Sequence, residues 1–159
     1  MGYHPSLASL TALRWSEGNP RRKGEPMLIS YQCTEGVWSL GYGHNLEAHP
    51  DPAYPARAGT TCTAEQAEIW LVADVLMAEL HMRRRWPWMQ TLPPAVYESC
   101  VELTFNMGVG RLASFVEMLR ALQTHDYNTA ACELHDSKWY RQVKPERGDR
   151  IINQTRRGQ

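Results

Sequence analysis

The chain has 159 residues, with 17 Lys and Arg side chains against 17 Asp and Glu, so its formal net charge is zero. A chain of this length is expected to form one domain with a core of its own. The charge balance excludes the composition of a disordered segment and of a strongly basic nucleic-acid binder. The charge is unevenly spread: residues 1–74 hold 5 basic and 8 acidic side chains, and residues 75–159 hold 12 and 9.

No membrane segment or export signal is expected. The longest uncharged runs, 2–13 and 86–97, have 12 residues each, whereas a membrane span needs about 18 apolar residues. The N-terminus lacks the basic stretch and apolar stretch of a secretory signal. The cysteines show no CxxC spacing, which argues against a zinc site. Free thiols in a reducing compartment are therefore predicted for Cys33, Cys62, Cys100 and Cys132.

The first part of the chain predicts a helix followed by a small sheet. A helix is expected over residues 6–17, because its leucines fall on one side and Gly18 is a suitable stop. Residues 19–26 contain two prolines, a glycine and three consecutive bases, which is typical of a loop. Alternating apolar and polar residues over 27–45, with a turn at 34–36, predict a β-hairpin or meander.

The rest of the chain predicts helices. Thr63 and Gln66 have the spacing of a capping box, and the apolar face that follows predicts a helix over 63–82, before Pro87. Gly108 and Gly110 are expected to end the next helix. The remaining expected helices cover residues 95–107, 112–123, 127–134, 137–142 and 145–156. The fold class is therefore α+β.

Three side chains in the first 45 residues are candidates for a catalytic role. Glu17 lies in the last turn of the first helix, where the partial negative charge of the helix end disfavours an ionised carboxylate. A carboxyl group that keeps its proton can act as a general acid. Cys33 and Ser39 are six residues apart, so on regular strands they point to the same side of a sheet.

Several segments, taken in order, resemble the phage-type lysozyme family of glycoside hydrolases, in particular the lysozymes of T-even phages. The resemblance covers residues 7 to 158, and it implies a lysozyme-like fold. Its segments are Leu13-Arg14-Trp15-Ser16-Glu17-Gly18, Thr34-Glu35-Gly36, Gly41-Tyr42-Gly43-His44, Thr63-Ala64-Glu65-Gln66-Ala67-Glu68 with Asp74, Phe105-Asn106-Met107-Gly108, and Ser137-Lys138-Trp139-Tyr140 with Arg147 and Arg150.

The resemblance implies an endolysin that hydrolyses the β-1,4 bond between N-acetylmuramic acid and N-acetylglucosamine in bacterial peptidoglycan. It assigns Glu17 as the general acid, and Cys33 and Ser39 as the pair that holds the attacking water. It also implies a His44–Asp74 ion pair, and it places Asn106 and Arg147 as substrate-binding or supporting residues, with Arg147 near Glu17.

One departure from the family leaves a second acid open. Fifteen residues separate Glu17 from Cys33, several more than the family pattern has, so residues 19–26 are interpreted as a loop insertion. The alternative acid is Glu25, which is separated from Cys33 by seven residues. Cys33 stands where the family usually has an aspartate, and the family tolerates this replacement. Ser39 stands where the family has a threonine, and it lacks the methyl group of that residue. Two alternative functions therefore stay open: a catalytically degenerate peptidoglycan-binding module and a lytic transglycosylase.

The resemblance also predicts how the chain is organised and used. One lysozyme-like domain is expected over 1–159, with an N-terminal lobe at 19–62, an inter-lobe helix at 63–82, and a C-terminal lobe at 83–159 that includes helix 6–17. The expected partner is the peptidoglycan glycan strand, met by a monomer with no cofactor, no metal, no nucleic acid and no stable membrane insertion. Localisation in the host bacterial cytoplasm is expected until a holin-type membrane lesion gives access to the periplasm and cell wall.

Overall fold

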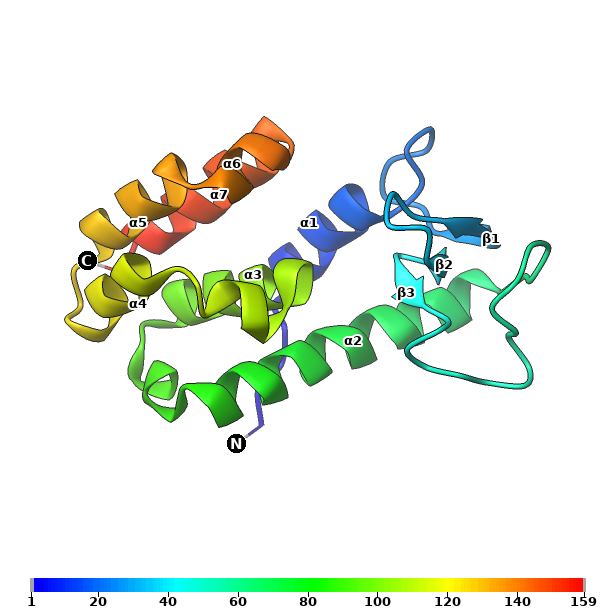
Figure 1. Ribbon diagram of the computed structural model, residues 1–159, viewed down its shortest axis with the longest axis horizontal. Coiled ribbons are helices and arrows are strands. Elements are labelled where there is room, and N and C mark those ends of the chain that lie inside the picture. Colours follow the sequence, from blue (N-terminus) through cyan, green and yellow to red (C-terminus); the bar gives the residue numbers. More distant parts are fainter. Residues whose placement is uncertain (1, 159) are drawn as a thin grey trace. The chain divides into compact units, whose positions relative to one another are not determined.

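The computed structural model describes residues 2–158 (Figure 1). Within them, seven α-helices, one 3-10 helix and a three-stranded antiparallel sheet form an α+β fold, which confirms the predicted class. Residue contacts divide the chain into two units. The N-terminal unit is His4–Asp74, and the C-terminal unit contains residues 75–158 together with 2–3. This division counts the first helix with the N-terminal unit, so the lobe limits implied by the resemblance stay a prediction.

The N-terminal unit begins with α1, Leu7–Glu17. The hydroxyl oxygen of Ser6 accepts a hydrogen bond from the backbone N–H of Ser9 at 3.0 Å, which satisfies one of the free donors at the helix start. At the other end, the N–H of Gly18 donates to the carbonyl of Arg14 at 3.0 Å. The expected helix therefore forms, and Glu17 is its last residue.

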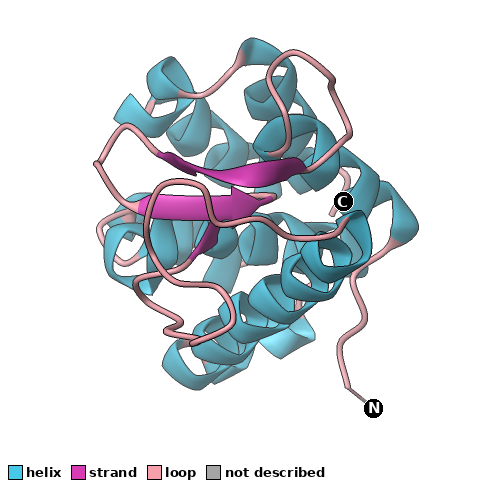
Figure 2. Cartoon of the chain, turned by 90° about the vertical axis from the view of Figure 1, so that its right-hand side faces the viewer, coloured by secondary structure: helices cyan, strands magenta, loops and turns pink. Residues whose placement is uncertain are grey.

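The sheet consists of β1 (Met27–Gln32), β2 (Trp38–Gly41) and β3 (His44–Asn45), in that order (Figure 2). The register shifts between Met27 and Tyr31. Gly41 is buried and has a φ of +66°, and a Cβ added to it would lie 3.0 Å from the Cβ of Ala67. A glycine is needed there because the strand end lies directly on the following helix.

That helix is α2, Ala64–Arg85. The Thr63 hydroxyl accepts from the N–H of Gln66 at 3.1 Å, as the capping pattern predicts. The helix ends three residues later than predicted, and the boundary between the two units falls within it, after Asp74. A short 3-10 helix, η1 (Pro87–Thr91), follows and was not predicted.

The C-terminal unit is a set of packed helices: α3 (Pro94–Leu112), α4 (Val116–Gln123), α5 (Tyr127–Asp136), α6 (Lys138–Gln142) and α7 (Pro145–Arg156). Helix α5 packs against α4 and α7, and α3 packs against α7. Its core includes fully buried apolar side chains such as Leu103, Leu112, Met118, Leu122, Leu134 and Ile151.

The helix predicted over 95–107 ends its regular geometry where the sequence predicted. Gly108 has a φ of +77° and a ψ of 160°, so it breaks the helical backbone directly after Met107. Glycine tolerates this positive φ without a Cβ clash. A short second helical segment, which was not predicted, follows as far as Leu112 and is counted with α3.

No helix within residues 2–158 combines the length and the apolar character needed to cross a membrane. The four cysteines are free thiols, and Cys100 is buried, which raises the pKa of its thiol to about 12.

Candidate active site

The carboxylate of Glu17 lies beside the turn between β2 and β3. A Cβ added to Gly43 would stand 3.9 Å from Glu17 Oε2 and 4.0 Å from the hydroxyl oxygen of Tyr31. The φ of Gly43 is +85°, a conformation that favours glycine. A side chain at position 43 would therefore be strained by the backbone conformation and would contact both groups, so the glycine leaves them uncovered at this point.

The sheet register brings the other candidate groups to the same place. Tyr31 is paired with Ser39 across β1 and β2, and directly opposed residues share a face of the sheet. Cys33 follows two residues after Tyr31 and continues the hairpin, because its N–H donates to the carbonyl of Val37 at 3.0 Å. By the two-residue alternation of a strand, Cys33 points to the face of Tyr31 and Ser39.

The pKa of the Tyr31 hydroxyl reflects the same neighbouring groups. Burial raises the pKa of its hydroxyl, and the negative charges of Glu17 and Cys33 raise it further. Tyr31 is thus a neutral phenol within electrostatic range of both groups. The sequence reasoning missed Tyr31, although its position two residues before Cys33 on an alternating strand was the available signal.

Ser39 is the most buried member of this cluster, with 4% of its surface exposed. Its hydroxyl donates to the carbonyl of Val37 at 3.4 Å, a long hydrogen bond. We call Glu17, Tyr31, Cys33 and Ser39 the carboxyl–thiol cluster. It combines one acid, one thiol and two hydroxyl groups on one face of a small sheet.

The alternative acid, Glu25, lies in a different setting. Its carboxylate is 3.7 Å from the Arg22 guanidinium, and 60% of its side chain is exposed. The backbone carbonyl of Glu25 accepts from the N–H of Asn19 at 2.7 Å. The inserted loop therefore closes on itself and returns the chain to β1 next to the end of α1, which supports the interpretation of residues 19–26 as an insertion.

A polar network fixes the end of α1. Arg14, one turn before Glu17, donates from Nε and Nη2 to the carboxylate of Glu68 at 2.9 and 2.8 Å. The Tyr42 hydroxyl lies 2.9 Å from Glu68 Oε1 and 3.2 Å from the carbonyl of Gly24. The hydrogen bonds from Arg14 lower the pKa of Glu68, and burial raises the pKa of Tyr42 to about 12. The network connects α1, the inserted loop, the β2–β3 turn and α2.

His44 and Asp74 form the contact that the resemblance implied. The Nδ1 atom of His44 is 2.8 Å from Asp74 Oδ2, and the side chain of His44 is 8% exposed. His44 also stacks on Trp70, with ring centroids 4.5 Å apart and planes at 3°. Because Leu40 and His44 are paired, they lie on the face of the sheet opposite to Ser39. His44 and Asp74 therefore support the sheet from behind the carboxyl–thiol cluster.

The two remaining candidates belong to the C-terminal unit. Asn106 lies in α3, and its side-chain oxygen accepts from the indole N–H of Trp139 at 2.7 Å. Arg147 lies in the first turn of α7 and is 8% exposed. Asn106 thus holds a buried tryptophan in place, and a substrate role for either residue stays a prediction.

Metal chemistry has no visible support in the described part of the chain. Within residues 2–158, no group of three or more His, Cys, Asp or Glu side chains is arranged to hold a metal ion. The carboxyl–thiol cluster offers proton transfer and hydrogen bonding to a water molecule or a hydroxyl group.

Comparison with known proteins finds a match over most of the chain. The model of the family described as phage lysozyme matches residues 26–157. The matched range includes Cys33, Ser39, His44 and Asp74, and it begins at the last residue of the 19–26 loop, so Glu17 lies outside it.

Two curated proteins are similar to this chain. An endolysin from Acyrthosiphon pisum secondary endosymbiont phage 1 is 32% identical over 114 residues, which cover 70% of this chain and 68% of that protein. The peptidoglycan hydrolase gp36 of Pseudomonas phage phiKMV is 29% identical over 123 residues, which cover 77% of this chain and 13% of that protein. The likeness to the second protein is thus confined to a small part of its length.

Proposed function

Because the chain belongs to the phage lysozyme family, we propose that it is an endolysin that hydrolyses bacterial peptidoglycan at the β-1,4 bond between N-acetylmuramic acid and N-acetylglucosamine. The names of its two relatives, an endolysin and a peptidoglycan hydrolase, support a hydrolase that acts on the cell wall. The observation that carries the finer proposal is the carboxyl–thiol cluster, in which Tyr31 lies within electrostatic range of both Glu17 and Cys33.

In the proposed reaction, Glu17 acts as the general acid. Its carboxyl group gives a proton to the glycosidic oxygen while the bond from that oxygen to the anomeric carbon breaks. Glu17 is suited to this role because the end of α1 that carries it is held in place. Arg14, one turn earlier in α1, donates two short hydrogen bonds to Glu68. A catalytic group needs such support, since small displacements cost much of the rate.

Cys33 and Ser39 hold the water that attacks the anomeric carbon from the opposite side of the sugar, with inversion of configuration. The sulfur of Cys33 accepts a hydrogen bond from the water, and the proton that the water loses passes to solvent. Ser39 orients the water through its hydroxyl, which can donate and accept. Proton uptake from solvent then restores the acid form of Glu17.

The proposal extends to where the protein acts. An endolysin of this kind is made in the host cytoplasm and acts as a monomer once a holin-type lesion lets it reach the wall. The finding that no helix in residues 2–158 is suited to span a membrane is compatible with this route.

The experiment compares wild type, Glu17→Gln and Glu25→Gln on purified peptidoglycan, with the products analysed by mass spectrometry. We expect muropeptides with a reducing end from wild type and Glu25→Gln, and a rate about a hundredfold to ten-thousandfold lower for Glu17→Gln. Glu25→Gln is the matched control, because it makes the same chemical change in an exposed loop. Circular dichroism shows whether each variant is folded.

Each other outcome selects an alternative. Loss of activity only in Glu25→Gln assigns the acid to the loop and overturns the role of Glu17. Products lighter by one water, with an anhydro end, identify a lytic transglycosylase. Glycan binding by folded wild type without any cleavage identifies a binding module. Undiminished activity in both Cys33→Ala and Ser39→Ala contradicts the proposed water site.

A further inference from the structure

The part of α2 that belongs to the C-terminal unit exposes apolar side chains to solvent. Leu76 is 36% exposed and Met77 is 45% exposed, and Leu80, one turn after Leu76, is half-buried. In an α-helix these three positions fall within about 100° of one another around the axis, so they share one face. Apolar side chains that are exposed next to one another mark a candidate contact surface, whereas isolated ones are ordinary.

The same face of α2 carries positive charge. Arg84 follows Leu80 by four residues, so the two side chains are neighbours on the helix surface, and Arg85 comes next in the chain. Both arginines are exposed. The ion pairs formed within residues 2–158 include neither of them. Two guanidinium groups therefore stand in water beside the apolar side chains.

The one carboxylate of this stretch is buried. Glu79 is the single acidic residue between positions 75 and 97 of the sequence, and it is 5% exposed. Its carboxylate lies 3.6 Å from Nε of Arg83 and accepts a hydrogen bond from the Tyr97 hydroxyl. The negative charge of the stretch is thus held inside with its own partners, and the charge at the surface is positive.

The 3-10 helix η1 continues directly from this end of α2 and brings a tryptophan to the surface. The N–H of Trp86 donates to the carbonyl of Met82 at 2.8 Å, and Met89 of η1 is fully buried, so η1 is fixed to the core. Trp88, next to the buried Met89, keeps part of its side chain exposed. An indole suits a boundary between an apolar and an aqueous phase, because its ring is apolar and its N–H donates a hydrogen bond.

We propose that this surface docks the protein reversibly on a bilayer that contains anionic phospholipid. Guanidinium groups bind phosphate through paired hydrogen bonds. The apolar side chains enter the boundary between the headgroups and the acyl chains. The protein lies on the bilayer and does not cross it. We call this the α2–η1 surface, and it consists of Leu76, Met77, Leu80, Arg84, Arg85 and Trp88.

The choice of a lipid surface follows from the combination of the two kinds of side chain. A soluble polyanion would pair with Arg84 and Arg85 but would leave Leu76 and Met77 in water. A second copy of the chain, docked through the same face, would bring the arginines of both copies together. An anionic bilayer offers phosphate to the arginines and apolar volume to the other side chains. This docking does not depend on the proposed hydrolysis.

The test is co-sedimentation of the full chain with vesicles of one part phosphatidylglycerol to two parts phosphatidylcholine, and with vesicles of phosphatidylcholine alone. We expect binding to the anionic vesicles that weakens as salt is added, because salt screens exposed charges. Arg84→Gln with Arg85→Gln should weaken this binding about thirtyfold. The matched control is Arg156→Gln with Arg157→Gln, which makes the same change of charge at two adjacent exposed arginines and should weaken it less than about threefold.

A second pair of variants tests the apolar half of the surface. Leu76→Ser with Met77→Ser should weaken binding to the anionic vesicles about tenfold, because less apolar area enters the bilayer. Its control is Val116→Ser, which changes an apolar side chain of α4 that is 55% exposed and should leave the binding unchanged. Circular dichroism shows whether each variant is folded.

Several outcomes would overturn the proposal. Equal weakening by the two double-arginine variants reveals attraction by net charge alone. Binding of soluble polyphosphate, with undiminished vesicle binding by Leu76→Ser with Met77→Ser, assigns the arginines to a polyanion. A wild-type dimer that the same serine variant dissociates assigns the face to a second copy. If wild type binds anionic vesicles but cleaves no peptidoglycan, the docking surface stands and the proposed hydrolysis falls.

Discussion

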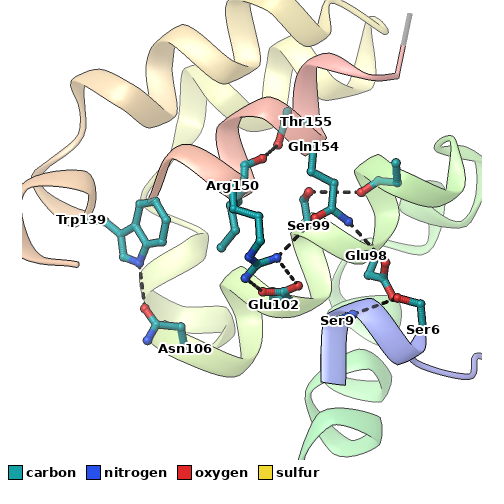
Figure 3. Close-up of polar contacts among 12 residues, drawn as sticks. Ser6, Ser9, Glu98, Ser99, Glu102, Asn106, Trp139, Arg150, Gln154 and Thr155 are labelled. Carbon is teal, nitrogen blue, oxygen red and sulfur yellow. Dashed lines mark hydrogen bonds and ion pairs between the residues drawn. The ribbon is translucent and has the colours of Figure 1, made fainter. Parts of the chain in front are cut away.

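Each of the two units contains an arginine–glutamate pair in which the guanidinium donates to both carboxylate oxygens, and the two pairs differ in burial. In the C-terminal unit, Arg150 of α7 donates to both oxygens of Glu102 in α3, at 2.9 and 2.5 Å, and Glu102 is 1% exposed (Figure 3). In the N-terminal unit, Arg14 makes similar bonds to Glu68, whose side chain is 37% exposed. Matching geometry thus occurs in two very different dielectric surroundings.

The difference teaches how each unit obtains its stability. If the partner of a carboxylate inside a helical core is removed, the protein loses much of its free energy of unfolding, because the charge stays buried. The loss is small for an exposed carboxylate, because water solvates it. The C-terminal unit therefore loses stability when one member of its buried pair is removed and the other is left. The N-terminal unit uses its exposed pair mainly to orient α1 beside the candidate site, and it contains close backbone approaches at Gly18 and Gly41.

The largest effect is expected when the buried pair is broken. Arg150→Met removes both hydrogen bonds of the guanidinium from a carboxylate in the core, so we expect the free energy of unfolding to fall by about 3–5 kcal/mol. Urea unfolding followed by circular dichroism measures it. Arg141→Met, an exposed arginine on α6, should change stability by less than about 0.5 kcal/mol. Adding Glu102→Met to Arg150→Met should restore much of the loss, and a loss below about 1 kcal/mol for Arg150→Met contradicts the comparison.

The next effect tests the backbone approach in the N-terminal unit. In Gly18→Ala, the new Cβ would lie 2.4 Å from the carbonyl oxygen of Glu25 and 2.6 Å from that of Arg14. Both atoms are backbone, so the helix end or the loop must shift, and we expect a loss of about 1–3 kcal/mol together with reduced lytic activity, because Glu17 is the adjacent residue. Gly110→Ala is the opposite case: it meets nothing within 4 Å and should gain up to about 1 kcal/mol. Equal effects of the two would contradict this interpretation.

A smaller effect is expected for the exposed pair. Arg14→Met should lower the free energy of unfolding by less than about 1 kcal/mol, because the Glu68 carboxylate remains partly solvated and keeps its contact with Tyr42. A drop in lytic activity larger than the drop in stability is expected, since Arg14 orients the helix end. A loss as large as that of Arg150→Met would erase the contrast between the units.

The smallest effect is a change in pH dependence. Hydrogen bonds from Arg14 hold the pKa of Glu68 below its usual range. Its contribution to stability is therefore complete above the unfolded pKa, about 4.3, and is lost as the pH falls through the lowered folded pKa. In Glu68→Gln, the loss of stability between about pH 6 and pH 3 should be shallower than in wild type. Parallel pH profiles of the two proteins would contradict the assignment.

Local signals in the sequence were sufficient for much of the fold. The stop at Gly18, the cap at Thr63 and the alternation of residues 27–45 each depend on neighbours within a few residues, and each predicted element formed. The break at Gly108 was predicted from the glycine itself, whereas the short helical segment that follows it up to Leu112 was not.

The candidate site was predictable only in part. The even spacing of Tyr31, Cys33 and Ser39 indicates a shared face, but the pairing of Tyr31 with Ser39 depends on the register shift in β1, which no local pattern reveals. The partner of Arg14 is 54 residues away in the chain, so its identity emerges only when α1 and α2 are packed. The stack of His49, His44 and Trp70 likewise joins a strand, a loop and a helix.

The loop over residues 19–26 has its ends joined by the hydrogen bond from the N–H of Asn19 to the carbonyl of Glu25. The chain between them, with its exposed bases Arg21, Arg22 and Lys23, can be lengthened, shortened or cut by a protease that cleaves after basic residues without moving what it connects. After such a cut, the N-terminal fragment would still be held by the hydrogen bonds from Arg14 to Glu68 and from Asn19 to Glu25. The face of the sheet that carries the carboxyl–thiol cluster is thus separated from the exposed bases of this loop, where proteases have the freest access.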